Sequence, residues 1–253
     1  MYAAERQQRI LAAARAHGRV EVSPLSDEFG VTTETIRRDL SALERRGLLR
    51  RVHGGAIPED LLEPEPGIEE RVGRRAEAKR RIAKRALEVI PEGGTVLLDA
   101  GTTTLAIAQV LPADASLTVV TNSLMIGAAL AARPGISLLQ IGGRVRPVTG
   151  AAVGPWACGE LASLTVDVGF MGCNGFDAAH GLTTPDQDEA ATKRAMLLAS
   201  RTTVLVSDAS KAGRVHLHRF AAIEEIDMVV TDAQLAEEIA EPIRAAGPDV
   251  VIA

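Results

Sequence analysis

The sequence predicts a small, mainly α-helical N-terminal domain with a short β-hairpin, joined to a larger α/β domain. Residues 1–57 carry helical patterns that end at glycines. Residues 58–70, PEDLLEPEPGIEE, are rich in Pro and Glu and are typical of a linker. In residues 71–253 short apolar runs alternate with helical patterns, which favours a largely parallel sheet covered by helices on both faces.

Composition narrows the class of protein. The chain is 46% hydrophobic and 24% charged, and no apolar run approaches the roughly 20 residues that span a bilayer. Glu5 and Arg6 interrupt any apolar region of a signal peptide. The two cysteines, Cys158 and Cys173, do not suggest a disulfide framework. We therefore expect a cytoplasmic protein that does not associate with membranes.

Charge is distributed unevenly along the chain. The net charge is -5, yet residues 1–55 contain ten Arg against seven Asp or Glu. Residues 69–85 contain eight Arg or Lys against three Glu, so the remainder is strongly acidic. This asymmetry favours a polyanionic partner near the N-terminus.

Apolar spacing and glycines place the first helices. A helix over residues 6–18 would bury Ile10, Leu11 and Ala14, and a shorter helix, PLSDEFGV, would end at Gly30.

The next helix, TTETIRRDLSALERRG, begins with Thr32 as its N-cap and ends at Gly47. Ile36, Leu40 and Leu43 recur at i, i+4 and i+7 and form its buried stripe. The opposite face and its flanks carry Glu34, Arg37, Arg38, Ser41, Arg45 and Arg46.

The segment LLRRVHGGAI then predicts a strand, a turn at Gly54 and Gly55, and a returning strand. Together these elements predict a winged helix-turn-helix, whose recognition helix enters the major groove while Arg contacts phosphate or guanine. Taken by themselves, Arg37 and Arg38 could simply belong to the solvent-exposed face of a surface helix. The basic wing favours DNA binding instead, through Arg50, Arg51 and His53.

The run FGVTTETIRRDLSALERRGLLRRVHGGA closely resembles the DNA-binding signature of DeoR-type bacterial transcriptional regulators. Thr32 stands where that family usually has Ser, which is a conservative change at an N-cap. The resemblance implies binding to double-stranded operator DNA. We expect a homo-oligomer, a dimer or tetramer, on half-sites spaced by whole turns of roughly 10 base pairs. The implied DNA-binding residues are Thr33, Glu34, Thr35, Arg37, Arg38, Ser41, Arg51 and His53.

Apolar runs predict the strands of the larger domain: residues 95–100, 117–122, 136–143, 166–172, 202–208 and 226–232. Helices are expected over 103–111, 123–132 and 188–200. A connecting helix is also expected within 71–90, with Ile82, Ala86 and Val89 on one face and cations on the others.

Polar residues gather where these strands end. The Gly-Thr-rich turn in VLLDAGTTTLAIAQVL could bind phosphate through helix N–H groups and Thr hydroxyls, although an ordinary capped turn is equally consistent. It matches no nucleotide-binding motif. Other strands are followed by Thr121-Asn122, Gly142 to Arg144, Asn174 to Asp177, and Asp208 to Lys211. Ligands of open α/β sheets bind beyond the carboxyl ends of strands, so these positions together predict a pocket.

The stretch DQDEAATKRAM places Asp186, Glu189 and Lys193 on one helical face. One interpretation is a surface Glu–Lys pair worth about 0.3–0.5 kcal/mol. The other has Lys193 or Lys211 contacting an anionic ligand while Glu189 or Asp186 accepts sugar hydroxyls.

The segments DAGTTT, TN, GG, NGF, EAATK and DASK, which lie between residues 99 and 211, also resemble those of the DeoR-type sensor domain. That domain is a Rossmann-like α/β domain similar in fold to ribose-5-phosphate isomerase. The resemblance implies a transcriptional regulator, most commonly a repressor, of a carbohydrate operon. A phosphorylated sugar or related metabolite would control it, with no cofactor or metal. The implied effector-binding residues are Asp99, Gly101, Thr102, Thr103, Thr104, Thr121, Asn122, Gly142, Gly143, Arg144, Asn174, Asp186, Glu189, Lys193 and Lys211.

Other functions stay open at this point. Related isomerases transfer a proton with paired carboxylates, whereas GCNGFD places Asn174 and Gly175 there, and an amide cannot act as a general base. This favours a binding pocket, although Asp177 leaves an isomerase with an appended DNA-binding module as the alternative. A third interpretation is a constitutive DNA binder. His216 and His218 lack a third metal ligand, and Cys173 suits a buried thiol.

Overall fold

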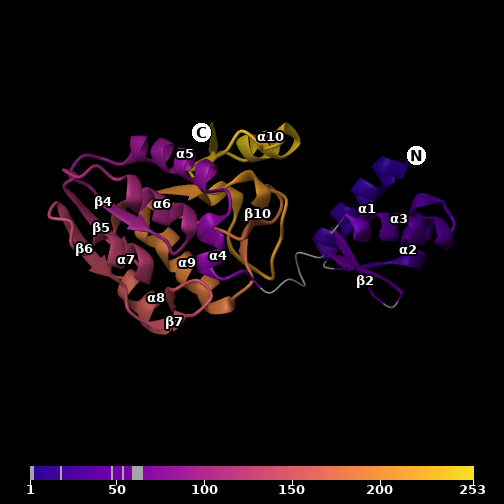
Figure 1. Ribbon diagram of the computed structural model, residues 1–253, viewed down its shortest axis with the longest axis horizontal. Coiled ribbons are helices and arrows are strands. Elements are labelled where there is room, and N and C mark those ends of the chain that lie inside the picture. The colour runs from indigo at the N-terminus through magenta and orange to yellow at the C-terminus, as the bar shows by residue number, and fades with distance from the viewer. Residues whose placement is uncertain (1–2, 18, 47, 53, 59–64) are drawn as a thin grey trace. The chain divides into compact units, whose positions relative to one another are not determined.

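A computed structural model of the protein describes residues 3–17, 19–46, 48–52, 54–58 and 65–253. The chain divides into two compact units, Met1–Glu65 and Pro66–Ala253 (Figure 1). Two predicted positions, Gly47 and His53, lie outside the described residues. Within the expected linker, Pro58 is the last residue of a strand and Ile68 begins a helix.

The N-terminal unit is a winged helix-turn-helix, as predicted. Its elements are α1 (Ala3–His17), β1 (Val20–Glu21), α2 (Val22–Phe29), α3 (Thr33–Arg45), β2 (Leu49–Val52) and β3 (Gly55–Pro58). The described strands form an antiparallel sheet in the order β1-β3-β2. The predicted stripe residues Ile36, Leu40 and Leu43 are buried against Ile10 and Ala14 of α1.

Strand β1 was not predicted, because two residues are too few to show an alternating pattern. Its pairing with β3 explains one glycine of the wing. A Cβ atom on Gly55 would lie 2.0 Å from the carbonyl oxygen of Val20, so only glycine lets the two strands approach.

The second unit is built on a parallel sheet, as predicted. Residues 66–253, which are all described, contain a seven-stranded sheet in the order β15-β14-β12-β9-β4-β5-β6, and every pairing in it is parallel. In that order the strands are Asp249–Ile252, Met228–Thr231, Ser200–Val206, Val166–Met171, Thr95–Leu98, Leu117–Thr121 and Ile136–Gln140. The edge strand β15 is additional to the predicted strands.

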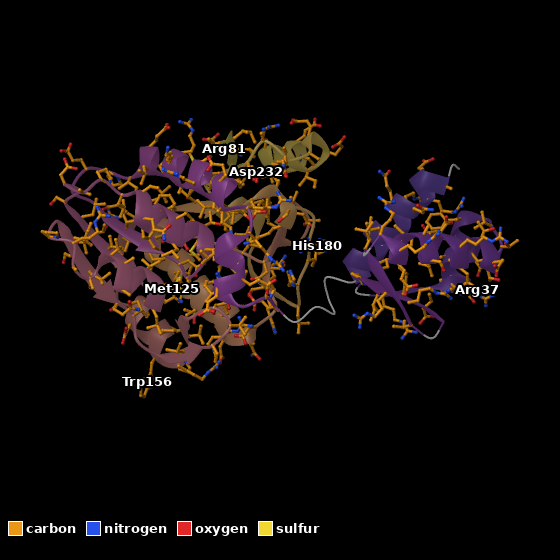
Figure 2. The ribbon with its side chains drawn as sticks, in the orientation of Figure 1. Arg37, Arg81, Met125, Trp156, His180 and Asp232 are labelled. Carbon is orange, nitrogen blue, oxygen red and sulfur yellow. The ribbon has the colours of Figure 1, made fainter. Side chains whose placement is uncertain are left out.

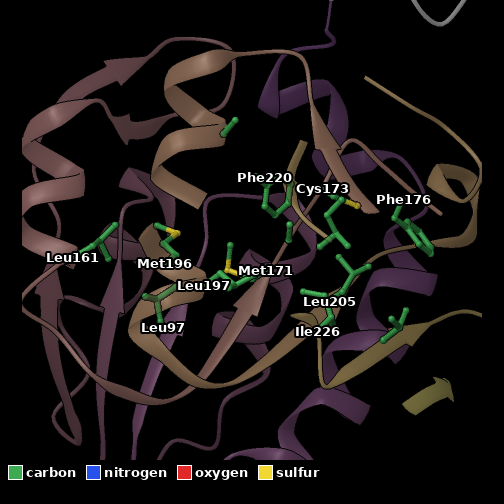
Figure 3. Close-up of a cluster of buried hydrophobic side chains, with 14 of the residues drawn as sticks. Leu97, Leu161, Met171, Cys173, Phe176, Met196, Leu197, Leu205, Phe220 and Ile226 are labelled. Carbon is green, nitrogen blue, oxygen red and sulfur yellow. The ribbon is translucent and has the colours of Figure 1, made fainter. Parts of the chain in front are cut away.

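Helices cover both faces of this sheet. Strand β4 shows the alternation, because Leu97 belongs to one buried cluster whereas Val96 and Leu98 belong to the other. The cluster around Leu97 includes Phe176 and Phe220 (Figure 3). The helices on the Leu97 face of the sheet are α8 (Pro155–Leu161), α9 (Gln187–Ala199) and α10 (Glu237–Ala245). The helices on the opposite face are α5 (Ala76–Ala86), α6 (Thr102–Val110) and α7 (Leu124–Leu130).

Two small antiparallel sheets were not predicted. Strands β7 (Arg144–Arg146) and β8 (Ala151–Val153) form a hairpin. A second sheet has the order β10-β11-β13, formed by Gly175–Asp177, Gly181–Thr184 and His218–Ala221. These strands have three or four residues each, which is too short for the sequence pattern to distinguish them from loops.

The connecting helix expected within residues 71–90 is present as α5 (Ala76–Ala86), with Ile82 and Ala86 buried, but it ends before Val89. The segment consists of α4 (Ile68–Gly73), α5 and a short 3₁₀ turn (Leu87–Val89). Arg75, between α4 and α5, has a φ of 53°, a left-handed conformation that cannot continue a helix. The cations are not all exposed either, because Lys79 is buried.

No helix in the described part of the chain is long and apolar enough to cross a membrane.

Candidate DNA-binding surface and ligand recess

The start of α3 is set by its N-cap. The hydroxyl oxygen of Thr32 accepts a hydrogen bond from the backbone N–H of Thr35 at 3.2 Å, as the sequence predicted. The preceding helix ends at Gly30, whose φ of 63° is left-handed. These two caps define the turn between α2 and α3.

The exposed face of α3 carries the predicted cations. The side chains of Arg37 and Arg38 are 53% and 81% exposed, and each lies within 4 Å of Glu34. Figure 2 shows Arg37 on the surface of the N-terminal unit. Surface pairs of this kind contribute about 1 kcal/mol or less, so the guanidinium groups can exchange Glu34 for a phosphate at little cost. Thr33 is also exposed, while Thr35 and Ser41 are half-buried.

The wing is joined to α3 by polar contacts. Arg51 donates a hydrogen bond to the hydroxyl of Ser41 at 3.2 Å, and its backbone N–H donates to Glu44 at 3.0 Å. Two predicted DNA-binding residues, Arg51 and Ser41, therefore touch. The wing and α3 form one continuous polar surface.

A buried ion pair that sequence analysis missed holds α3 against α1. Arg6 donates a hydrogen bond to Asp39 at 2.6 Å, Gln7 donates to the other carboxylate oxygen at 2.9 Å, and both Arg6 and Asp39 are buried. The available signal was that Asp39 lies three residues after Ile36, inside the apolar stripe. A buried carboxylate requires a partner.

The second unit has a recess at the carboxyl ends of its central strands. Several of the predicted effector-binding residues line it: Gly101, Thr102, Thr103, Thr104, Asn174, Glu189, Lys193 and Lys211. They come from the start of α6, the β9–β10 turn, α9, and the 3₁₀ turn after β12 (Ala209–Lys211). Segments distant in sequence thus converge at one place, as the rule for parallel sheets predicts.

The start of α6 supplies backbone donors to the recess. The first hydrogen bond within this turn runs from the N–H of Leu105 to the carbonyl of Gly101 at 2.9 Å. The N–H groups of Thr102 to Thr104 come earlier and have no acceptor one turn before them. Thr104 turns its hydroxyl back to the carbonyl of Gly101, at 3.0 Å. Helix N-termini of this kind attract anions.

Lys193 is a buried cation with carboxylate partners. Its ammonium group donates to Asp99 and, at 3.1 Å, to the carbonyl of Gly172, and it lies 3.5 Å from Glu189. Burial disfavours the charge, but Asp99 and Glu189 together raise the pKa of Lys193, so it stays protonated. The interpretation of Glu189 and Lys193 as a surface pair was wrong, because both are buried.

Lys211 differs from Lys193 in its charge balance. It donates to the carbonyl of Cys173 at 2.7 Å, and within the described part of the chain no carboxylate lies at ion-pair distance from it. Burial lowers the pKa of Lys211, and the neighbouring cations Arg71 and Lys193 add to the effect, whereas Cys173 and the carboxylate of Asp208 act in the opposite direction. An anion in the recess would therefore stabilise the Lys211 ammonium group.

Several predicted residues do not line the recess. Thr121 donates to the carbonyl of Leu98 at 2.6 Å, and the buried amide of Asn122 joins the N–H of Ala100 to the carbonyl of Ala152. These two side chains hold strand ends together. Asp99 lies behind Lys193, where it also accepts the N–H of Gly172 at 2.9 Å.

The residues of the β6–β7 connection do not line the recess either. Gly142 donates to Glu160 at 2.9 Å, and Arg144 pairs with Asp188 on the surface at 2.6 Å. Gly143 has a φ of 144°, and a Cβ there would lie 2.9 Å from the carbonyl of Val153. Its role is thus conformational.

Asp186 is the N-cap of α9, where it accepts the N–H of Glu189 at 2.9 Å. Burial acts in the opposite direction, but this hydrogen bond and Arg146 lower the pKa of Asp186. Arg146 lies 3.3 Å from Asp186 and 3.1 Å from Glu189. Sequence analysis missed Arg146, because nothing in the sequence indicates that β7 passes beside α9.

The remaining residues offer little for catalysis. Asp177 accepts a hydrogen bond from the backbone N–H of His180 and contacts its ring at 3.0 Å, and it does not line the recess. Glu189, which lines the recess, is paired with Arg146 and Lys193, and Asp99 is paired with Lys193. In the described part of the chain, no cluster of His, Cys, Asp and Glu could hold a metal ion.

Comparison with known proteins gives the family. The family model described as "DeoR-like helix-turn-helix domain" matches residues 6–60, and that of the "DeoR C terminal sensor domain" matches residues 74–233. The HTH-type transcriptional regulator GlpR of Haloferax volcanii is 41% identical over 99% of this chain and 98% of its own. The glycerol-3-phosphate regulon repressor of Escherichia coli K12 is 34% identical over 90% of each chain.

Among solved structures, ribose-5-phosphate isomerase A of Methanocaldococcus jannaschii aligns with 54% of this chain and 54% of its own, at 15% identity and a TM-score of 0.40. The relatives that match over nearly the whole chain are transcriptional regulators and not enzymes. With a winged helix-turn-helix and an α/β sensor domain that both match their family models, the chain belongs to the DeoR family of transcriptional regulators.

Proposed function

We propose that the protein is a cytoplasmic, homo-oligomeric repressor of a carbohydrate operon, and that a phosphorylated sugar or related metabolite in the recess controls its binding to operator DNA. The observation that carries the ligand class is Lys211, which lacks a described carboxylate partner and lies beside the start of α6. A phosphate group there would pair with Lys211 and accept hydrogen bonds from the N–H groups of Thr102 and Thr103.

The rest of the recess suits a sugar. Asn174 and Glu189 line it with an amide and a carboxylate, which can bind hydroxyl groups in both donor and acceptor roles. Arg146 and Lys193 both lie at ion-pair distance from Glu189 and offset its charge, so the acid does not repel a phosphorylated ligand. A relative named as a glycerol-3-phosphate regulon repressor supports the same class of effector.

For the DNA interface we propose the surface shared by α3 and the wing. Arg37 and Arg38 would reach bases and phosphates of the DNA. Thr33 and Thr35 would contact the sugar-phosphate backbone of the DNA, and Glu34 would accept a hydrogen bond from a cytosine amino group. Ser41 and Arg51 would act as the contacting pair described above, next to the DNA.

A gel-shift assay with DNA from the protein's own promoter region tests this interface. Arg37→Ala/Arg38→Ala should abolish the shift at low salt, because it removes two bidentate donors from α3. The matched control is Arg201→Ala/Arg244→Ala, which removes the same charge from exposed ion pairs of the second unit. Equal binding by the two double variants would contradict the assignment.

A thermal-shift screen tests the ligand. A saturating phosphorylated sugar should raise the Tm, since a ligand that binds only the folded protein stabilises it by mass action. The matching unphosphorylated sugar should have no effect. If no phosphorylated sugar shifts the Tm, the protein is better described as a constitutive DNA binder.

A further inference from the structure

Helix α4 is the first element of the second unit after the linker, and it contributes Arg71 to the recess. It lies beside α6, which supplies the backbone donors of the same recess (Figure 1). None of the residues of α4 is buried. A short helix normally depends on burial of an apolar face for its stability, and the apolar residues of α4 are only partly covered: Ile68 is half-buried and Val72 is 37% exposed.

Polar contacts also hold α4 in place. The N–H of Ile68 donates to the carbonyl of Val148 at 2.9 Å, and the ammonium group of Lys79, on α5, donates to the carbonyl of Arg71. Each such contact contributes about 1 kcal/mol net. Helix α4 therefore buries less apolar surface than α5 or α6, whose apolar faces are buried in the core.

The junction between α4 and α5 is strained. Arg75 is the one non-glycine residue with a positive φ among the described residues. That conformation costs about 1–2 kcal/mol for a residue with a Cβ. Its guanidinium group donates to Gln234 at 2.6 Å and lies 3.6 Å from Asp208. These contacts compensate for the strain at the junction between α4 and α5.

The charges around α4 repel one another across the recess. Burial, followed by the charge of Lys211, lowers the pKa of Lys79 to about 8, and Arg71 adds to the effect. Arg71 also lowers the pKa of Lys211. Arg71 of α4 thus faces Lys211 of the 3₁₀ turn after β12, and the carboxylate of Asp208 offsets only part of this repulsion. An anion placed between them would turn this repulsion into attraction.

We propose that Arg71 is a ligand-binding residue, and that α4 acts as a strap which the anionic group of the ligand draws onto the second unit. The proposal rests on the proposed function, because it requires an anion in the recess. Helix α4 directly follows the linker in the chain. Holding α4 in one position therefore also holds the end of the linker that leads to the DNA-binding unit. Ligand and DNA are then coupled if they favour different positions of α4.

Hydrogen exchange of the full-length protein, with and without saturating inorganic phosphate, tests the strap. In the wild type, phosphate should slow amide exchange at least several-fold in two segments, residues 66–73 and the start of α6. In Arg71→Gln, phosphate should still protect the start of α6, with several-fold weaker affinity, but should no longer protect residues 66–73. Arg81→Gln removes an exposed charge from α5 and serves as the matched control, which should behave like the wild type.

The outcomes separate the two proposals. Protection of α6 without protection of residues 66–73 in the wild type would overturn the strap and leave the recess intact. Protection of neither segment would overturn both. Unchanged protection of residues 66–73 in Arg71→Gln would show that Arg71 does not bind the anion. The wild-type comparison needs no variant, so a folding defect in Arg71→Gln cannot hide the answer.

Discussion

Lys193, on α9, donates a hydrogen bond from its ammonium group to the carboxylate of Asp99, which follows β4 and lies 94 positions earlier in the chain. The two side chains are 3% and 1% exposed. This pair joins a helix to the strand end that borders the recess. It also distinguishes the two lysines there, because Lys193 is neutralised by the protein whereas Lys211 has no described carboxylate partner.

The Lys193–Asp99 pair should be important for stability. Asp99→Asn should lower the free energy of unfolding by about 3–5 kcal/mol, because it leaves a buried ammonium group without its main partner. Arg194→Gln is the control on the same helix. It removes an exposed pair with Glu225 at 2.6 Å, and should cost about 1 kcal/mol or less. Urea unfolding of the two variants measures the difference, and similar small losses would show that Asp99 is dispensable.

Lys211 should determine anion affinity. Lys211→Met keeps most of the side-chain volume but removes the cation, so it should abolish the Tm shift caused by a phosphorylated sugar. Lys84→Met, which removes an exposed cation of α5, is the control and should keep the full shift. A Lys211→Met protein that still responds like the wild type would place the phosphate elsewhere.

Stability should rise with pH above the pKa of Lys79. Burial and then Lys211 lower this pKa to about 8, below its value of 10.5 in the unfolded chain, so the unfolded state binds more protons between the two values. Below about pH 8 both states are protonated and the cost of burying the charge is fully present. From pH 8 upward that cost is progressively relieved.

The comparison that isolates this effect is between wild type and Lys79→Met. The free energy of unfolding of the wild type should increase from about pH 7.5 to about pH 9.5 relative to that of the variant. A difference that stays constant across this range would mean that Lys79 titrates normally.

The buried pair of Arg6 and Asp39 should stabilise the N-terminal unit specifically. Arg6→Ala should speed amide exchange throughout α3, because a buried carboxylate without its partner costs about 3 kcal/mol or more. Arg9→Ala breaks an exposed pair with Glu28 at 3.3 Å and should change exchange little. Exchange within α6 should be unaffected by both substitutions.

Regular features of the fold could be predicted from the sequence. The stripe of α3, its cap at Thr32 and the parallel strands all follow from local spacing, and the structure has them. The rule that ligands lie beyond strand ends correctly predicted that polar residues from several strand ends gather at one edge of the sheet. It could not separate Thr121 and Asn122 from the recess, because backbone groups from other strands bind those side chains.

Other features depend on contacts that no local pattern encodes. The break at Arg75 requires a left-handed residue where the sequence has no glycine, and it is supported by Asp208 and Gln234 from distant segments. Arg71 lies within a run of cations whose spacing does not show which one reaches the recess. Such residues become recognisable only when the chain is folded.

The most direct test of the whole account is the affinity of the full-length protein for DNA from its own promoter region, measured by fluorescence anisotropy with and without phosphorylated sugars. We predict tight binding at low salt that weakens steeply as salt rises. At least one phosphorylated sugar should change the Kd several-fold, while its unphosphorylated form should not. Absence of binding at low salt, or a Kd that no phosphorylated sugar alters, would contradict the account.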